Sequence, residues 1–375
     1  MEFTKVTVEW SPKTFMFYLM VILGCYIIPI LLNKKNIRWK NGKSGKYPLG
    51  IAIVSLLLVV VKCFNTTGRD LRSGYIHNFE SATSMADYYD KTVEPGFRLL
   101  MVLVNKATGS YAVFLFVVGL LTVLPVIHFI HKYEEKIDVP TAFLLYSSIY
   151  FINGFSAYRQ YMAVSLSLFV LDAILEERQY KALVWIAVSG MIHVSCLVLI
   201  IPYLLSFAKV LSKKMIAISA LVFFVIFFIG RGSVASMLGG YERYSIYLVS
   251  QEIDFGLEQI IYYAPIFLLL YLSRKKIADE GISRVAYIYI ITGFMFGMIS
   301  YILPIFGRMQ SVFMPIIILV PYYIRRYKEK CKINKRIVTN IIVFCYSVAR
   351  FVVWIVQYYN LEDVMPYTNL FGIVI

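Results

Sequence analysis

One polar stretch separates two apolar runs and ends on the residue best suited to bind an anion. It covers residues 153–160, with Arg159 and Gln160 at its end. A charged side chain at membrane depth is costly unless it faces protein or a water-filled cavity and has an anionic partner, so an arginine there indicates a functional site. Because a guanidinium binds phosphate through two parallel hydrogen bonds and keeps its charge, we interpret Arg159 as a phosphate ligand.

Two more polar junctions interrupt apolar runs that are distant in sequence. His193 follows a run that ends at residue 192, and Gly307 and Arg308 follow a run that ends at residue 303. Histidine titrates near neutral pH, which suits a general base or a hydrogen bond to substrate. The alternative for His193 is a structural hydrogen bond at a helix junction. Arg308 adds a second candidate phosphate ligand.

Residues 65–109 contain further charged residues that such a site would use. Among the carboxylates, Asp70 and Glu94 are our candidate catalytic residues because each neighbours a turn that bears an arginine, Arg69 or Arg98. The alternative is that these arginines reach lipid headgroups or pair with Asp70 and Glu94. In residues 230–258, tyrosines recur every three positions, and the side chains predicted to contact sugars are Tyr241 and Tyr244.

Signatures of cofactor and metal sites are absent from the sequence. It contains no glycine-rich nucleotide loop, no zinc-protease motif and no Cys/His framework, and its five cysteines are scattered. We therefore predict neither a cofactor nor a metal. Catalysis would then rest on positioning and on arginine stabilisation of a leaving pyrophosphate.

The elements that must position these residues are membrane helices. Of the 375 residues, 59% are hydrophobic and 16% are charged, and apolar runs of about 20 residues recur along the chain. We predict an all-α polytopic membrane protein with a single domain over residues 1–375. It would have about twelve transmembrane helices, both termini outside, and short broken helices around an outward-facing cavity. The two larger external loops would be residues 65–109 and 230–258.

The charge distribution predicts the orientation. The net charge is +15, and 24 of the 37 lysines and arginines fall in six short loops. These loops are residues 33–47, 131–140, 176–182, 209–214, 274–284 and 325–336. The positive-inside rule assigns them to the cytosol, so the basic charge reports topology and predicts no nucleic-acid partner.

Several short motifs in a fixed order carry a family resemblance, which covers roughly residues 14 to 330. The motifs are Gly68-Arg69-Asp70, Glu94-Pro95-Gly96-Phe97, Arg159-Gln160 with Met162-Ala163, His193 with Ser195, and Gly307-Arg308. In these motifs and their order, the chain resembles the EpsG branch of the Wzy-type polysaccharide polymerases. The segment after Arg336 matches no pattern of the family.

The resemblance implies a glycosyltransferase of the bacterial cytoplasmic membrane. Such an enzyme joins oligosaccharide repeat units carried on undecaprenyl pyrophosphate, at the outer face of the bilayer. Arg159 and Arg308 would then bind pyrophosphate or substrate, with Arg69, Arg98 and Gln160 as further ligands and Asp70, Glu94 and His193 as catalytic candidates. A chain-length regulator and a flippase are the protein partners that the resemblance implies. The product is left open among capsule, exopolysaccharide and O-antigen.

Two other classes of function compete with the polymerase. A flippase or other transporter of lipid-linked oligosaccharides also suits many spans and an arginine-lined cavity, but it should show internal repeats and access from both faces. We find no repeat, and the polar junctions all fall on one predicted side. A membrane acyltransferase would bring a cytosolic acyl donor to a catalytic histidine, whereas His193 is predicted to lie outside.

Overall fold

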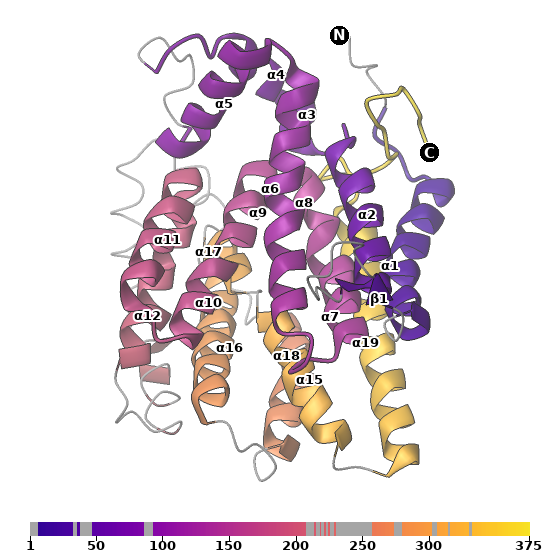
Figure 1. Cartoon of the computed structure of the whole chain (residues 1–375), viewed down its shortest axis with the longest axis vertical. Helices are drawn as coiled ribbons and strands as arrows, with labels where there is room; N and C mark the ends of the chain where they lie inside the picture. The colour runs from indigo at the N-terminus through magenta and orange to yellow at the C-terminus, as the bar shows by residue number, and fades with distance from the viewer. Residues whose placement is uncertain are drawn as a thin grey trace.

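The described residues form a bundle of helices with one pair of two-residue strands (Figure 1). The computed structural model describes residues 7–32, 36–37, 47–85, 93–207, 257–273, 280–301, 306–313, 316–329 and 332–375, with single positions between 214 and 229. Two short strands, β1 (Asn36–Ile37) and β2 (Tyr47–Pro48), pair antiparallel across the first basic loop. The predicted sugar contacts Tyr241 and Tyr244 lie outside the described residues.

The first half of the chain contains helices of very different lengths. They are α1 (Pro12–Leu32), α2 (Leu49–Cys63), α3 (Arg69–Ser73), α4 (Tyr75–Glu80), α5 (Pro95–Thr108), α6 (Tyr111–Lys132), α7 (Val139–Tyr146) and a π-helix, η1 (Ser147–Phe151). After η1 come α8 (Asn153–Ser156), α9 (Tyr158–Leu166), α10 (Leu168–Leu175), α11 (Gln179–Ile192), a 3₁₀-helix, η2 (Val194–Leu199), and α12 (Ile200–Phe207).

The second half is described from residue 257 onward. Its helices are α15 (Leu257–Ser273), α16 (Glu280–Ser300), α17 (Phe306–Val312), α18 (Ile316–Glu329) and α19 (Ile333–Tyr358). Within the described residues, four helices are long and apolar enough to cross a bilayer, namely α1, α6, α16 and α19. The shorter apolar helices include α2 and α15. The membrane class is therefore confirmed, whereas the count of about twelve spans and the outward-facing cavity stay predictions.

The predicted polar interruption is a break in helical structure. Widened π turns in η1 lead into the single turn of α8, and Ala157, with φ −96° and ψ 69°, separates α8 from α9. His193 marks a second break, because its extended backbone (φ −150°, ψ 120°) ends α11 before η2 begins. Broken helices at membrane depth are tolerated where they are buried in protein, and both breaks are buried.

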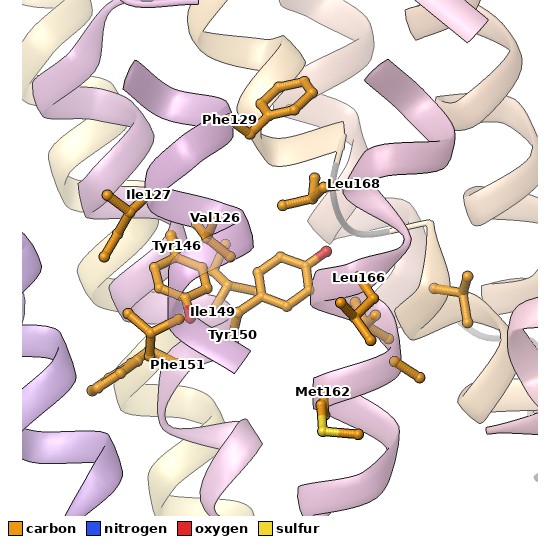
Figure 2. Packing of buried hydrophobic residues seen from close by; sticks show 14 of the residues in the cluster. Val126, Ile127, Phe129, Tyr146, Ile149, Tyr150, Phe151, Met162, Leu166 and Leu168 are labelled. Atoms are coloured by element: carbon orange, nitrogen blue, oxygen red, sulfur yellow. The ribbon is translucent and has the colours of Figure 1, made fainter. Parts of the chain in front are cut away.

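The core around the first break is packed with large apolar side chains. Figure 2 shows Tyr146, Tyr150 and Phe151 of the η1 region among residues of α6 and of α9–α10. The Tyr146 and Tyr150 rings stack with centroids 6.3 Å apart, and Phe151 meets Phe155 edge-on at 5.2 Å. Interlocked aromatic rings of this kind hold the broken segment in one conformation.

Three of the predicted basic loops meet at one end of the bundle. Lys132 pairs with Glu176 at 2.7 Å, and Lys328 pairs with Asp138 at 3.0 Å. An Arg325 guanidinium nitrogen donates to the carbonyl of Glu134 at 2.9 Å. Residues from 131–140, 176–182 and 325–336 therefore share one side, as the charge pattern predicts. The opposite end carries α3, α4 and α5 (Figure 1), and we call it the α3–α5 end.

The C-terminal segment, residues 359–375, folds back onto the α3–α5 end. Thr66 donates its backbone N–H to the Thr368 carbonyl at 2.9 Å, and the Tyr367 hydroxyl donates to the Val61 carbonyl at 3.0 Å. The Ser11 hydroxyl donates to the carbonyl of the last residue, Ile375, at 3.2 Å. This tail, for which the sequence offered no role, thus packs against the end of α2 and the start of α1.

Gly68 immediately precedes α3 and lies against the backbone of the first break, at Phe155. Its φ of +117° lies in the region that side chains rarely adopt, and a Cβ at this position would overlap the carbonyl oxygen of Phe155. The next residue, Arg69, donates its N–H to the Glu362 carbonyl at 3.1 Å. Glycine is therefore required for α3 to lie against the broken segment.

We expect Gly68→Ala to lower the free energy of unfolding by about 2–5 kcal/mol, because it adds backbone strain and a backbone clash. The measurement is the thermal unfolding midpoint of the purified protein in detergent. Gly109→Ala is the matched control: Gly109 also has a positive φ, +60°, but a Cβ there meets no atom within 4 Å. The control should lose only about 1–2 kcal/mol, and equal losses would contradict the close approach.

Candidate functional site

An ion pair between Arg159 and Glu94 forms the centre of the candidate site. Arg159 is the second residue of α9, directly after the break, and Glu94 is the residue before the first turn of α5. A guanidinium Nη1 lies 2.9 Å from a carboxylate oxygen, and the side chains are only 15% and 8% exposed. The arginine singled out in the sequence thus has the anionic partner that its burial requires.

Glu94 also joins this centre to the second break. Its Oε1 accepts the backbone N–H of Val194 at 3.3 Å, immediately after His193. Gly96, two residues after Glu94, lets α5 approach the end of α11. A Cβ added at Gly96 would lie only 2.9 Å from the Cβ of Met191. The Glu94 carboxylate therefore contacts both breaks. Gly96 keeps α5 and α11 close enough for these contacts to form.

The side chain of Asp70, in α3, lies at the N-terminus of α9. Its Oδ2 accepts the backbone N–H of Tyr158 at 3.1 Å and the hydroxyl of Tyr75, also at 3.1 Å. A carboxylate is favoured there because the backbone N–H groups of a helix N-terminus carry partial positive charge. Burial nevertheless raises the pKa of Asp70 above its ordinary value of 3.8, while the nearby charges of Arg159 and Arg308 partly oppose that rise. Both arginines therefore act electrostatically on this carboxylate.

Gln160 connects α9 to α17, which carries Arg308. Its side-chain amide donates to the backbone carbonyl of Arg308 at 3.2 Å and to the hydroxyl of Ser311. The Ser311 hydroxyl in turn donates to the same Arg308 carbonyl at 2.8 Å. These bonds hold the backbone of α17 against α9, so the third predicted junction is a short helix docked beside the first.

His193 is engaged in local structure. Its Nδ1 lies 2.8 Å from the hydroxyl of Ser195 and accepts the backbone N–H of Ser195 at 3.3 Å. The side chain is buried and caps η2. This geometry fits the structural alternative raised from the sequence, and a catalytic role for His193 stays a prediction.

The two remaining arginines lie at the edges of this arrangement. Arg69 is exposed at the start of α3. Arg98 lies one turn into α5, where its Nη2 donates to the carbonyl of Val93 at 3.1 Å. The structure thus brings Asp70, Glu94, Arg159 and Gln160 together with α17, and leaves Arg69 facing outward.

Comparison with known proteins places the chain in a family. The model of the EpsG family matches residues 47–369, which is most of the chain and includes all the polar junctions. The chain belongs to the EpsG family. No curated protein and no solved structure matches it significantly. The EpsG family is associated with glycosyltransferase-like polymerases of polysaccharide biosynthesis, and the apolar helices agree with its membrane location. The match extends past residue 330, where our resemblance stopped, to the buried part of the tail.

One buried cation of this EpsG-family site was missed by our reading of the sequence. Lys62, at the end of α2, is fully buried and donates to the carbonyl of Gly154 in α8. Its Nζ also lies 3.7 Å from the centroid of the Tyr158 ring. The available signal was a lone lysine inside an otherwise apolar run. Lys62 holds the broken segment that presents Arg159.

The arrangement combines fixed positive charge with a proton acceptor. Arg159 and Arg308 supply two guanidinium groups, and Asp70 supplies a half-buried carboxylate whose raised pKa makes it a stronger base than an exposed aspartate. Within the described residues, no group of three or more His, Cys, Asp or Glu side chains is placed to hold a metal. In this EpsG-family protein, the described groups can therefore bind a polyanion and accept a proton beside it.

Proposed function

We propose that this EpsG-family protein is a polysaccharide polymerase that joins oligosaccharide repeat units carried on undecaprenyl pyrophosphate. The observation that supports this function best is the largely buried ion pair of Arg159 and Glu94, which lies beside Asp70 at the start of α9. A largely buried arginine paired with a carboxylate can exchange that partner for phosphate oxygens, because phosphate also accepts charge-assisted hydrogen bonds from guanidinium. The proposed substrate class is therefore a lipid-linked glycan pyrophosphate.

The proposed reaction transfers one glycan to another. The bond between the anomeric carbon of the donor glycan and its pyrophosphate oxygen breaks, and a hydroxyl oxygen of the acceptor glycan forms a new bond to that carbon. Asp70 takes the proton of the hydroxyl. The departing undecaprenyl pyrophosphate keeps the bonding electron pair, and Arg159 and Arg308 stabilise the negative charge that develops on it. Glu94 orients Arg159 before the substrate binds.

The proposed location is the cytoplasmic membrane of a bacterium, with the site facing outward. Support comes from the distribution of charge between the two ends of the bundle. Lys132, Arg325 and Lys328 gather at the end opposite α3, α4 and α5, and the positive-inside rule assigns such an end to the cytosol. The candidate site, built on α3 and the start of α5, then meets substrate from outside.

Deletion of the gene in its host tests this function. We expect single lipid-linked repeat units to accumulate on the outer leaflet, where a membrane-impermeant glycan-labelling reagent reaches them. Long glycan should be lost and should return with the wild-type gene but not with an empty vector. Accumulation on the inner leaflet would instead identify a flippase, and unchanged glycan lengths would rule out a polymerase.

A further inference from the structure

A cavity of about 430 Å³ lies among α15, α18 and α19, and none of the residues assigned to the candidate site lines it. Most of its lining is apolar, and it includes Ile266, Leu269, Val320, Ile324 and Ile342. On α19 the lining residues are at positions 334, 335, 338, 339, 342, 343, 346 and 350, so one face of the helix borders the cavity along its first two-thirds. An elongated apolar ligand fits this shape.

Arg350 lines one end of this cavity, and two of its guanidinium nitrogens have no hydrogen-bond acceptor among the described residues. Its guanidinium carbon lies 3.3 Å from the centroid of the Tyr262 ring. Its Nε and Nη1 atoms are buried and make no hydrogen bond to any described residue, and no described carboxylate forms an ion pair with it. Buried guanidinium nitrogens without an acceptor are costly at membrane depth, so an anionic oxygen from a ligand would stabilise Arg350.

The Arg350 end of the cavity adjoins the candidate site. Gln310 lines the cavity and lies two residues after Arg308 on α17. Its side-chain amide donates to the Gln259 side chain at 2.6 Å, while the neighbouring Ser311 is bonded to Gln160. A ligand in the cavity can therefore place its polar end beside the residues assigned to pyrophosphate.

We propose that this cavity binds the polyisoprenyl chain of a lipid-linked substrate, with Arg350 donating to a phosphate oxygen of the same molecule. The proposal rests on the polymerase function above and identifies where the lipid part of the substrate lies. Arg350 is eight residues from the end of α19, which is about 12 Å of helix. The choice of this occupant rests on the link from the cavity, through Gln310 and Ser311 of α17, to the residues assigned to pyrophosphate. A bilayer phospholipid is the competing occupant that the test distinguishes.

The test is native mass spectrometry of the full chain in detergent. The probes are undecaprenyl phosphate, the uncharged alcohol undecaprenol, and phosphatidylglycerol as a competitor. Wild type should bind the phosphate about tenfold more tightly than the alcohol, because only the phosphate offers Arg350 a charged acceptor. Arg350→Gln should lose this preference and still bind the alcohol.

A matched pair of variants on α19 tests the cavity without touching Arg350. Ile342 and Ile341 are 57% and 56% exposed, but only Ile342 lines the cavity. Ile342→Trp should fill part of the cavity and weaken binding of both isoprenoid probes by about tenfold or more, and Ile341→Trp should leave it unchanged. Because both side chains are half exposed, neither change should prevent folding.

Three results would overturn the proposal: equal binding by the two tryptophan variants, an unchanged phosphate preference in Arg350→Gln, or displacement of undecaprenyl phosphate by equimolar phosphatidylglycerol. The third would make the cavity a site for bilayer phospholipid. Because binding is measured without glycan, a failure here would leave the polymerase proposal standing. Conversely, an unchanged glycan in the deletion strain would leave the binding result standing.

Discussion

Replacing Arg159 with alanine is expected to lower glycan polymerisation by about 100- to 1,000-fold, the range lost when one donor to a developing anion is removed. In the proposed reaction, Arg159 stabilises the charge on the departing pyrophosphate, and water cannot replace a side chain that is only 15% exposed. The measurement is the chain-length distribution of the glycan in the deletion strain, with each variant expressed to the wild-type level.

Arg159→Lys separates charge from geometry. Lysine keeps the positive charge but not the two-pronged hydrogen bonding, so we expect an intermediate loss of at least about tenfold. The matched control is Arg178→Lys. Arg178 is 54% exposed and pairs with Glu176 at 3.2 Å, at the end of the bundle opposite α3. The control should leave chain length unchanged.

A charge swap distinguishes phosphate binding from a purely structural ion pair. The double variant Arg159→Glu, Glu94→Arg restores an ion pair between α5 and α9 and should recover thermal stability relative to either single variant. It should not recover polymerisation, because the cation then projects from the wrong helix. Recovery of full chain length by the swap would mean that Arg159 only holds the two helices together.

Asp70→Asn is expected to lower polymerisation by about 100- to 10,000-fold, the range supplied by general acid–base catalysis. Asparagine can still accept the N–H of Tyr158 and the hydroxyl of Tyr75, so the start of α9 should keep its structure. It cannot take a proton from the acceptor hydroxyl. In wild type, the rate should rise with pH through the raised pKa of Asp70, and in Asp70→Asn this rise should disappear.

Asp70→Asn should lower polymerisation without lowering the folding stability of the protein. Because burial raises the folded-state pKa of Asp70 above 3.8, the unfolded chain loses this proton first as pH rises. Folding stability from this group therefore falls between pH 3.8 and the folded-state pKa, and the full cost is present above it. Asp70→Asn, which is neutral at every pH, should be at least as stable as wild type at neutral pH.

The thermal unfolding midpoints of wild type and variant, measured from about pH 4 to pH 8, test this linkage. Glu80→Gln serves as the control, since Glu80 ends the neighbouring helix α4 with a side chain 65% exposed. Its substitution should change neither chain length nor the pH dependence of unfolding. A marked loss of stability in Asp70→Asn would instead mean that the charged form of Asp70 holds α9 in place.

The membrane class and the family could be inferred from the sequence because they depend on local patterns. Apolar runs of about 20 residues predicted membrane helices, and α1 and α6, with 21 and 22 residues, have that length. The break before Arg159 was also predicted from a local pattern, because a polar cluster between apolar runs cannot continue a lipid-exposed helix. Basic loops that share one end of the bundle followed from charge alone.

Only the tertiary structure decided which charges meet. Glu94 and Arg159 are separated by 65 positions, and nothing local distinguishes Glu94 from other carboxylates in the same loop as the partner of Arg159. Lys62 and Arg350 looked like single charges in apolar runs until packing placed one beneath the break and the other beside an apolar cavity. Ion pairs and cavities form between segments distant in sequence, so their energy depends on how the helices pack and not on any local pattern.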